Sequence, residues 1–317
     1  MANQLIEIAE KVAGCLQLAT LLEVSAYPKP GNVHRMADFP ETRFEHYLAS
    51  AIAVAPPFKS GAEKGISVAK GTINPYDIRV GKIIRDAVTN VSEWQHGGNT
   101  LLGAIILLSP ISVAAGMTFA EGPFSVAKLR QRLKIVVEST TPQDAVDVYH
   151  AILIAKPQGL GKVSRFDVTD PNSMQNILDE KISLHEIFEM SSNYDSVASE
   201  WVGNYPITFE LGYPYFNKLI KNEIDINIAI VQTFLEVLSK VPDTFIARKV
   251  GLSKANEVSA QAKEVLEKGG LLTPDGRKHI HSFDRQIRDP DHQLSPGTTA
   301  DIITAVLAVS ILDGYRP

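Results

Sequence analysis

The sequence predicts an all-α fold, a single large domain over residues 1–317 with roughly ten or more helices. Apolar residues recur every three to four positions over most of the chain, as they do on the buried face of a helix. The sequence lacks clean alternation of apolar and polar residues and lacks a strand–helix–strand rhythm, which would indicate a sheet. Two halves, 1–156 and 180–317, joined by a loop-rich segment, are the alternative organisation.

Two early segments carry the helical pattern most clearly. In the first, the apolar stripe consists of Leu5, Ile8, Val12, Cys15, Ala19 and Leu22. In the second, it consists of Val80, Ile83, Ile84, Ala87, Val88 and Val91. Both stripes predict helices with one face in the core. Because the single cysteine, Cys15, falls within the first stripe, we expect it to be buried rather than reactive.

Later helices are marked by their start and stop signals. Thr141 followed by Pro142 predicts a helix that ends at about Lys156, and a capping-box pattern at Ser183 predicts the start of another. Further helices are expected over residues 224–238, 255–266 and 298–312. Residues 157–179 are the most loop-like part of the chain, since proline and glycines follow the helix end there.

The composition is that of a globular protein with a large core and an acidic charge balance. Hydrophobic residues make up 44% of the sequence, and the formal net charge is −5 at pH 7. A nucleic-acid-binding protein needs a basic face, so we expect no nucleic-acid partner. The longest apolar stretch, Leu101–Ala115, contains Pro110 and is too short to span a bilayer. Charged residues interrupt the N-terminus, so no signal peptide is expected, and the prediction is a cytoplasmic protein with no membrane partner.

The loop after the first helix is the most informative segment and reads Pro28-Lys29-Pro30-Gly31-Asn32. The two prolines fix φ on either side of the lysine, and Gly31 allows a sharp turn because it has no Cβ. The expected result is a rigid loop that presents an ammonium group, an amide side chain and free N–H groups. A plain helix stop is the alternative interpretation, but two further loops of similar chemistry follow.

The second loop contains Gly98, Asn99 and Thr100 and precedes a very apolar helix. Asn99 or Thr100 can cap this helix, and its free N–H groups together with the helix dipole favour a bound anion. Gly103 leaves room beside the first turn. A capped core helix without any ligand is the alternative interpretation of this segment.

The third loop reads Pro296-Gly297-Thr298-Thr299 and precedes the last apolar helix. The threonines offer hydroxyl groups and a cap, and we expect Asp301 in the first helical turn. The helix dipole alone stabilises a carboxylate at that position, which is the structural alternative. The functional hypothesis is that Asp301 holds Mg²⁺ bound to phosphate oxygens, a site that needs only one or two carboxylates.

Other charged residues suit a phosphorylated ligand and its metal. They are Asp38, Glu41 and Arg43 after the first loop, Asp243 and Arg248 near the two ends of one or two helical turns, and Arg285 and Arg288 in a charged run before the third loop. Guanidinium groups bind phosphate well, while the acids are either first-turn helix charges or a metal and base site. A zinc site is not expected, because the eight histidines form no His-x-x-x-His pair and no Cys/His cluster exists. Neither a P-loop nor a Rossmann fingerprint occurs, so any nucleotide must be held by helix ends and separated charged residues.

These motifs, in this order, resemble the triphosphoribosyl-dephospho-CoA synthase family, whose members make the prosthetic-group precursor of citrate lyase and malonate decarboxylase. The resemblance covers the chain from about Leu5 to Leu312. It rests on Glu23 with Pro28-Lys29-Pro30-Gly31, on Gly98-Asn99-Thr100 with Gly103-Ala104, on Asp243-Thr244, and on Pro296-Gly297 with Ala300-Asp301. Bacterial members usually carry Asp in place of His34, Gly-Ser in place of Thr298-Thr299, and a Gly-Ala-His-x-Asp-Met segment in place of residues 37–42. In this chain Glu41 is the candidate replacement for the Asp of that segment, and its His has no counterpart. The pattern looks more like the archaeal-type branch of the family.

The resemblance implies an all-helical pentosyltransferase that moves the triphosphoribosyl group of ATP to the 2′-hydroxyl of 3′-dephospho-CoA and releases adenine. Our hypothesis gives the phosphates to Lys29, Arg285 and Arg288, and gives Mg²⁺ to Asp301 with Asp243 or Glu41. Glu23 or Asp38 is the candidate base, Glu41 is a further catalytic candidate, and Asn99 and Thr100 orient the ribose or a phosphate. The remaining expected nucleotide contacts are Gly31, Asn32, Arg43, Gly98, Arg248, Gly297, Thr298 and Thr299. Transfer or glycosidic cleavage with another acceptor, and a non-catalytic nucleotide-binding protein, are the alternatives, and a homodimer is left open.

Overall fold

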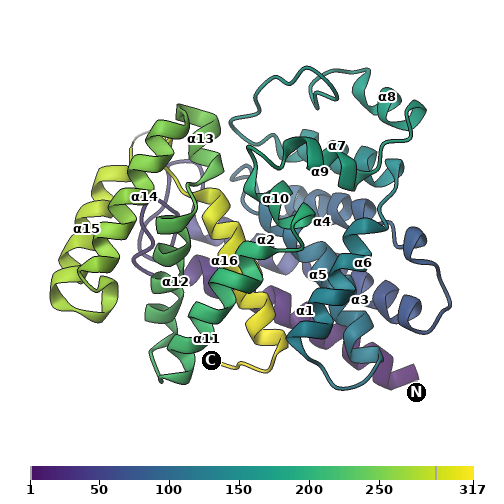
Figure 1. The fold of residues 1–317 in the computed structure, drawn as a ribbon, viewed down its shortest axis with the longest axis horizontal. Coiled ribbons are helices and arrows are strands. Elements are labelled where there is room, and N and C mark those ends of the chain that lie inside the picture. Colours follow the sequence, from purple (N-terminus) through teal and green to yellow (C-terminus); the bar gives the residue numbers. More distant parts are fainter. Residues whose placement is uncertain (1, 290) are drawn as a thin grey trace.

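The computed structural model describes residues 2–289 and 291–317, and this part of the chain consists of helices and loops without any strand (Figure 1). The α-helices are α1 (Ala2–Ser25), α2 (Phe44–Ala53), α3 (Ala55–Ala69), α4 (Val80–Trp94), α5 (Leu102–Ala120), α6 (Val126–Glu138), α7 (Pro142–Ala155), α8 (Ser173–Asp179), α9 (Leu184–Ser191), α10 (Ser196–Val202), α11 (Tyr213–Lys221), α12 (Ile226–Lys240), α13 (Thr244–Val250), α14 (Leu252–Glu267), α15 (Pro274–Ile287) and α16 (Gly297–Leu312). Shorter helical segments are η1 (Pro75–Asp77), η2 (Ile207–Gly212) and η3 (Gly270–Leu272). The predicted all-α class is confirmed.

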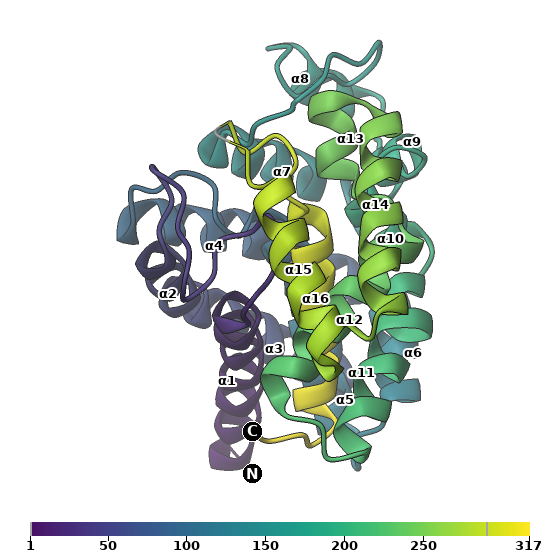
Figure 2. The same ribbon diagram turned by 90° about the vertical axis from the view of Figure 1, so that its left-hand side faces the viewer.

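Two apolar helices, α5 and α16, form the centre of the molecule and contact one another. Helices α1, α3, α4 and α6 pack around α5, while α11, α12 and α13 pack against α16 (Figure 1). Figure 2 shows α12, α14 and α15 side by side on one flank of the molecule. Because α1 also packs against α16, one hydrophobic core extends from Ala9 to Leu312 and includes residues of both predicted halves.

A proline inside α5 explains how α10 is attached to the core. Pro110 has no N–H, so the carbonyl oxygen of Ile106 loses its helical partner. The indole Nε1 of Trp201 in α10 donates to that oxygen at 3.2 Å, and the hydroxyl of Tyr205 donates to the next carbonyl, that of Leu107, at 2.9 Å. A buried carbonyl rarely stays unpaired, so this bond fixes α10 against α5.

The expectation that the apolar stretch in α5 is too short to span a bilayer is wrong. The helix extends beyond Ala115 to Ala120 and reaches 19 residues with a mean hydropathy of 1.9, which is long and apolar enough. However, 89% of that window is buried inside the protein. The helix therefore faces other helices, as the central helix of a globular core does.

The helix boundaries agree well with the local signals. Thr141 caps α7 and Ser183 caps α9, and both form the expected capping boxes. The predicted helices near residues 224–238, 255–266 and 298–312 appear as α12, α14 and α16. The predicted loop-rich segment is irregular over residues 156–172 and then forms α8, which packs on α7. This segment borders the candidate site rather than simply joining two halves.

Candidate active site

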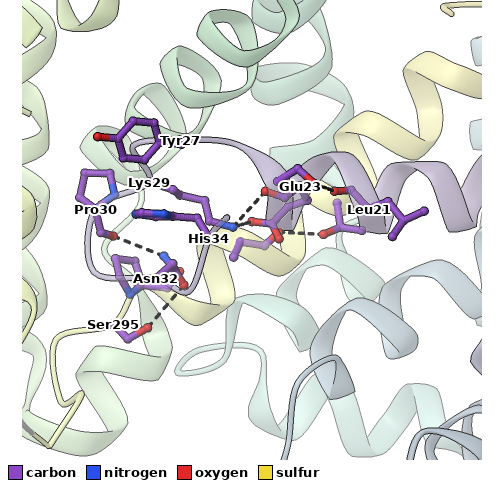
Figure 3. Close-up of polar contacts among 12 residues, drawn as sticks. Leu21, Glu23, Tyr27, Lys29, Pro30, Asn32, His34 and Ser295 are labelled. Carbon is purple, nitrogen blue, oxygen red and sulfur yellow. Dashed lines mark hydrogen bonds and ion pairs between the residues drawn. The ribbon is translucent and has the colours of Figure 1, made fainter. Parts of the chain in front are cut away.

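The loop after α1 turns back and places its lysine against the end of that helix (Figure 3). The Lys29 ammonium forms an ion pair with the Glu23 carboxylate and also donates to the Glu23 carbonyl oxygen at 3.1 Å. Lys29 is only 1% exposed and Glu23 only 4% exposed. Removing either partner would leave an uncompensated buried charge, so each charge keeps the other in place. The loop thus presents one fixed cation and one fixed carboxylate.

Helix α15 holds this loop in position. Gly31 has a φ of 70°, and its N–H donates to Asp284 Oδ1 at 2.8 Å. Arg288 donates to the carbonyl oxygen of Asn32 at 2.7 Å and to Asp284 at 3.1 Å. The loop lies so close to α15 that a Cβ on Gly31 would be 2.9 Å from Ile287 Cδ1. Arg288 therefore supports the loop backbone.

His34 ends the same loop and is neutral at physiological pH. Burial and the nearby Arg288 guanidinium lower the pKa of His34 to about 4. Its Nδ1 accepts from the Met36 N–H at 3.2 Å, and its Nε2 lies 3.4 Å from Arg288 Nη2. Through these contacts, His34 helps to hold the loop in position.

Asp301 of α16 contacts the first turn of α5. The Ala104 N–H donates to Asp301 Oδ1 at 2.9 Å, as a free N–H at a helix start donates to an anion. Gly103 provides the space, since a Cβ there would be 2.0 Å from Asp301 Oδ2. The prediction that Asp301 lies in the first turn of its own helix is wrong. The helix begins at Gly297, so Asp301 is its fifth residue and is stabilised by the neighbouring helix start.

The environment of Asp301 disfavours a lone negative charge. Burial raises the pKa of Asp301 well above the usual range, and the negative charge of Glu23 raises it further. Burial also raises the pKa of the Tyr47 hydroxyl in α2, and the negative charges of Glu23 and Asp301 raise it further. A cation placed between these carboxylates would relieve both effects.

The other predicted loop residues at the start of α5 have distinct roles. The N-cap residue of α5 is Leu101 rather than the predicted Asn99 or Thr100, but Asn99 Oδ1 accepts from the Leu102 N–H at 3.1 Å and so pairs one free N–H of the first turn. Thr100 instead exchanges a hydrogen bond of 2.8 Å with the Ser50 hydroxyl of α2. Gly98 has a φ of 76°. The loop is therefore fixed both to its own helix and to α2.

The three predicted loops border one cavity of about 1450 Å³. Lys29, Asn99 and Asp301 all line it, so segments far apart in the sequence meet there. The predicted residues in its wall are Glu23, Lys29, Asn32, Glu41, Gly98, Asn99, Thr100, Arg248, Gly297, Thr298 and Asp301. Pockets for single small ligands usually measure roughly 300–1,000 Å³, so this one has room for a larger ligand or for two.

The remaining predicted residues are not in the cavity wall: Gly31, Asp38, Arg43, Asp243, Arg285, Arg288 and Thr299. Asp38 Oδ1 accepts from the Phe44 N–H at 2.8 Å and caps α2. One oxygen of Asp243 caps α13, while the other accepts from the N–H and hydroxyl of Thr299 at 2.7 and 2.8 Å. With four donors on its two oxygens, Asp243 joins α13 to α16 and does not offer a free metal ligand. Arg43 and Arg285 are exposed side chains.

The sequence reasoning missed many residues of the cavity wall, among them Tyr47, Lys156, Lys162, Arg165 and Lys249. Two of them, Lys162 and Arg165, belong to the segment that is predicted to link two halves. The signal there was a pair of glycines, Gly159 and Gly161, next to basic side chains, a combination that suits phosphate as well as it suits a helix end. Lys249 directly follows the predicted Arg248.

Lys249 is held at the cavity wall by neighbouring groups. Its ammonium donates to the carbonyl oxygen of His292 at 2.5 Å and lies 3.9 Å from the centre of the Phe245 ring. Burial lowers the pKa of Lys249 to about 8. A group of this kind is still mostly a cation at neutral pH.

Within residues 2–289 and 291–317, no group of three or more His, Cys, Asp and Glu side chains is arranged to hold a metal ion. A site completed by ligand oxygens needs fewer protein groups, and Mg²⁺ on a nucleotide is commonly held by one or two carboxylates. Asp301 beside Glu23, in the space that Gly103 leaves, fits that requirement.

The fold and the site define a class: an all-helical protein whose helix starts and charged loops enclose a pocket for phosphorylated small molecules. A comparison with family models agrees with this and makes it specific. The chain belongs to the CitG family, ATP:dephospho-CoA triphosphoribosyl transferase, whose model matches residues 9–317. It is therefore an enzyme of the transferase class, and the resemblance inferred from the loops is confirmed.

Relatives with related names cover nearly the whole chain. The 2-(5″-triphosphoribosyl)-3′-dephosphocoenzyme-A synthase of Klebsiella pneumoniae is 23% identical over 305 residues, which are 95% of this chain and 91% of that protein. A probable synthase of the same name from Pseudomonas fluorescens is 23% identical over 96% of this chain and 92% of its own length. A crystal structure from Archaeoglobus fulgidus, provisionally named triphosphoribosyl-dephospho-CoA synthase, has a TM-score of 0.60 and 20% identity over 85% of this chain and 100% of that chain. At that identity, the structural likeness shows the fold alone.

Proposed function

We propose that this protein transfers the triphosphoribosyl group of ATP to the 2′-hydroxyl of 3′-dephospho-CoA and releases adenine. The observation that carries the proposal is the meeting of the buried Glu23–Lys29 pair with Asp301 in one large cavity. The family to which the chain belongs supplies the reaction type. Both substrates are charged metabolites of the cell interior, so we propose a cytoplasmic location as well.

The chemistry is a displacement at the anomeric carbon of the ATP ribose. The 2′-oxygen of the acceptor forms a bond to this carbon, while the glycosidic bond to adenine breaks and its electron pair leaves with the base. The proton lost by the hydroxyl ends on the released adenine, so the reaction is balanced. The carbon gains oxocarbenium character during the step, and nearby carboxylates stabilise that positive charge.

Glu23 is the base that we assign to the acceptor hydroxyl. Its carboxylate is buried, lines the cavity and is oriented by Lys29, and burial raises the pKa of Glu23. A carboxylate in such a place accepts a proton near neutral pH better than an exposed one. Glu41 lines the same cavity but is exposed, and Asp38 already caps α2.

The triphosphate of ATP is assigned to the end of the cavity near Lys29. Asp301 would hold Mg²⁺, which when bound with ATP neutralises phosphate charge. Asn99 and Thr298 line the cavity at the starts of α5 and α16 and would orient the ribose or a phosphate. Arg285 and Arg288 are not part of this assignment, because they lie outside the cavity wall.

The purified protein, incubated with ATP, Mg²⁺ and dephospho-CoA, is expected to release one adenine for each acceptor consumed. Chromatography of the reaction mixture distinguishes adenine from ADP and AMP. Formation of ADP or AMP in place of adenine would contradict the transfer chemistry. Adenine release at the same rate without dephospho-CoA would instead support transfer to another acceptor or glycosidic cleavage.

A further inference from the structure

The cavity has two chemically different regions. The inner region contains the buried Glu23 and Lys29 and the partly buried Asp301. The outer region is formed by residues 156–168, by the α9–α10 connection and by α13. The proposed function places ATP in the inner region but leaves the outer region without a ligand.

The outer region exposes large apolar side chains. Leu160, Val163, Met190 and Tyr194 are between 41% and 48% exposed, and all four line the cavity. They come from two segments that both line this wall, the loop after α7 and the stretch from α9 to α10. Clustered apolar side chains on the wall of a cavity indicate contact with an apolar part of a ligand.

Basic side chains lie in the same region. Lys162, Arg165, Arg248 and Lys249 all line the cavity. Arg248 is paired with Asp195 at 2.8 Å, and Arg165 is paired with Glu180, so acids fix both guanidiniums from one side. A guanidinium held in this way can still donate to phosphate oxygens.

Helix α13 connects the two regions. Phe245 packs against the start of α16, where a Cβ on Gly297 would be 3.0 Å from its ring, and Lys249 lies over the same ring. The cavity wall therefore combines exposed apolar residues and basic residues in its outer region with the acids of its inner region. Dephospho-CoA has a group for each of these three kinds of wall residue: a pantetheine arm with methyl and methylene groups, a diphosphate, and a ribose with the reacting 2′-hydroxyl.

We propose that the outer region is the acceptor subsite, with the basic residues on the diphosphate of dephospho-CoA and Leu160, Val163, Met190 and Tyr194 on its pantetheine arm. This inference rests on the proposed function and adds the orientation of the acceptor. A nucleoside triphosphate would use the cations but would leave the apolar wall without a partner. The arm points to the cavity mouth, and the ribose of the acceptor points towards Glu23.

The test compares Michaelis constants for the two substrates. Replacing both Lys162 and Arg165 by Gln is expected to raise KM for dephospho-CoA about tenfold, because one or two charge-assisted hydrogen bonds to its diphosphate are lost. KM for ATP is expected to change less than about twofold. Lys263→Gln is the matched control, since Lys263 is an exposed lysine of α14 outside the cavity. A rise in KM for ATP instead, or no change in either constant, would overturn the subsite assignment.

A second measurement isolates the apolar wall. ADP carries the diphosphate and the 2′-hydroxyl but no pantetheine arm, so it serves as a truncated acceptor. Replacing Leu160 and Met190 by Ser is expected to lower the preference of kcat/KM for dephospho-CoA over ADP about tenfold, and an unchanged preference contradicts the proposal.

Calorimetric titration with dephospho-CoA separates failure of this inference from failure of the proposed function. If the wild-type protein released no adenine, the proposed reaction would fail. Binding of dephospho-CoA about tenfold weaker in the double Gln variant would still support the subsite, whereas equal binding would refute it.

Discussion

At the scale of single residues, the proposed site consists of two buried charged side chains, one partly buried carboxylate and the space around them. Glu23 and Lys29 neutralise one another, while Asp301 rests on the first turn of α5. The sequence motifs identified all three residues. The pattern did not reveal that Glu23 is the partner of Lys29, because the ion pair depends on the loop turning back onto α1.

Gly103→Ala tests the position of the Asp301 carboxylate. The new methyl group would be 2.0 Å from Asp301 Oδ2, so the carboxylate must move, and we expect kcat for adenine release to fall at least about tenfold. The helix itself should not suffer, since alanine favours helices more than glycine by about 1 kcal/mol. Gly14→Ala in α1 is the control, because nothing lies within 4 Å of its new methyl group. Equal activity of both variants would argue against the assigned role of Asp301.

Lys249 gives the proposed acceptor subsite a pH dependence. Its pKa is lowered to about 8 by burial and by Arg248, although Asp243 and Asp289 act in the opposite direction. The ammonium is charged below this pKa and loses its charge above it, so KM for dephospho-CoA should rise as the pH passes 8. In Lys249→Arg, the guanidinium stays charged and the rise should disappear. An identical pH profile of KM in both proteins would exclude Lys249 from the subsite.

At the scale of secondary-structure elements, helix starts could be predicted and helix partners could not. The caps Thr141 and Ser183 form local hydrogen bonds at the starts of α7 and α9, so a local sequence pattern is enough to predict these two helix starts. The bond from Trp201 to the Ile106 carbonyl that Pro110 leaves unpaired joins residues 95 positions apart, and no local sequence pattern indicates it. The role of Arg288 could not be predicted for the same reason. Its guanidinium is predicted from the sequence to bind phosphate, but in the structure it supports the loop after α1.

Helix α15 is predicted to act on the site through that loop. Asp284→Ala removes the acceptor of the Gly31 N–H, and such a loss costs roughly 1–3 kcal/mol of unfolding free energy. We expect faster hydrogen exchange at the amides of Gly31 and Asn32 together with a lower kcat. Asp275→Ala, at the exposed start of the same helix, should leave both unchanged. Unchanged exchange at Gly31 in the Asp284 variant would show that α15 does not position the loop.

At the scale of the whole molecule, the helices build one core around α5 and α16. The apolar periodicity was sufficient to predict an all-α domain. The cavity was only partly predictable, because its basic wall comes from a segment without periodicity, residues 156–168. Such a segment takes its position from tertiary contacts, which composition and spacing do not encode.

A single core predicts a single unfolding event. Since α1 packs on α16, the halves 1–156 and 180–317 should not fold separately, and far-ultraviolet circular dichroism and tryptophan fluorescence should report the same denaturation midpoint. Trp201 in α10 is fully buried and is the fluorescence probe of unfolding, whereas circular dichroism reports on the helices of both halves. Two separate midpoints would indicate two independent domains.

The mass of the acceptor after reaction tests the central claim most directly, namely that the assembled cavity joins the ribose of ATP to dephospho-CoA. Mass spectrometry of a reaction with ATP and Mg²⁺ should show dephospho-CoA enlarged by one triphosphoribosyl group, and Asp301→Asn should form little of this product. Unmodified dephospho-CoA beside free adenine, or an acceptor enlarged by a single phosphate, would contradict the account.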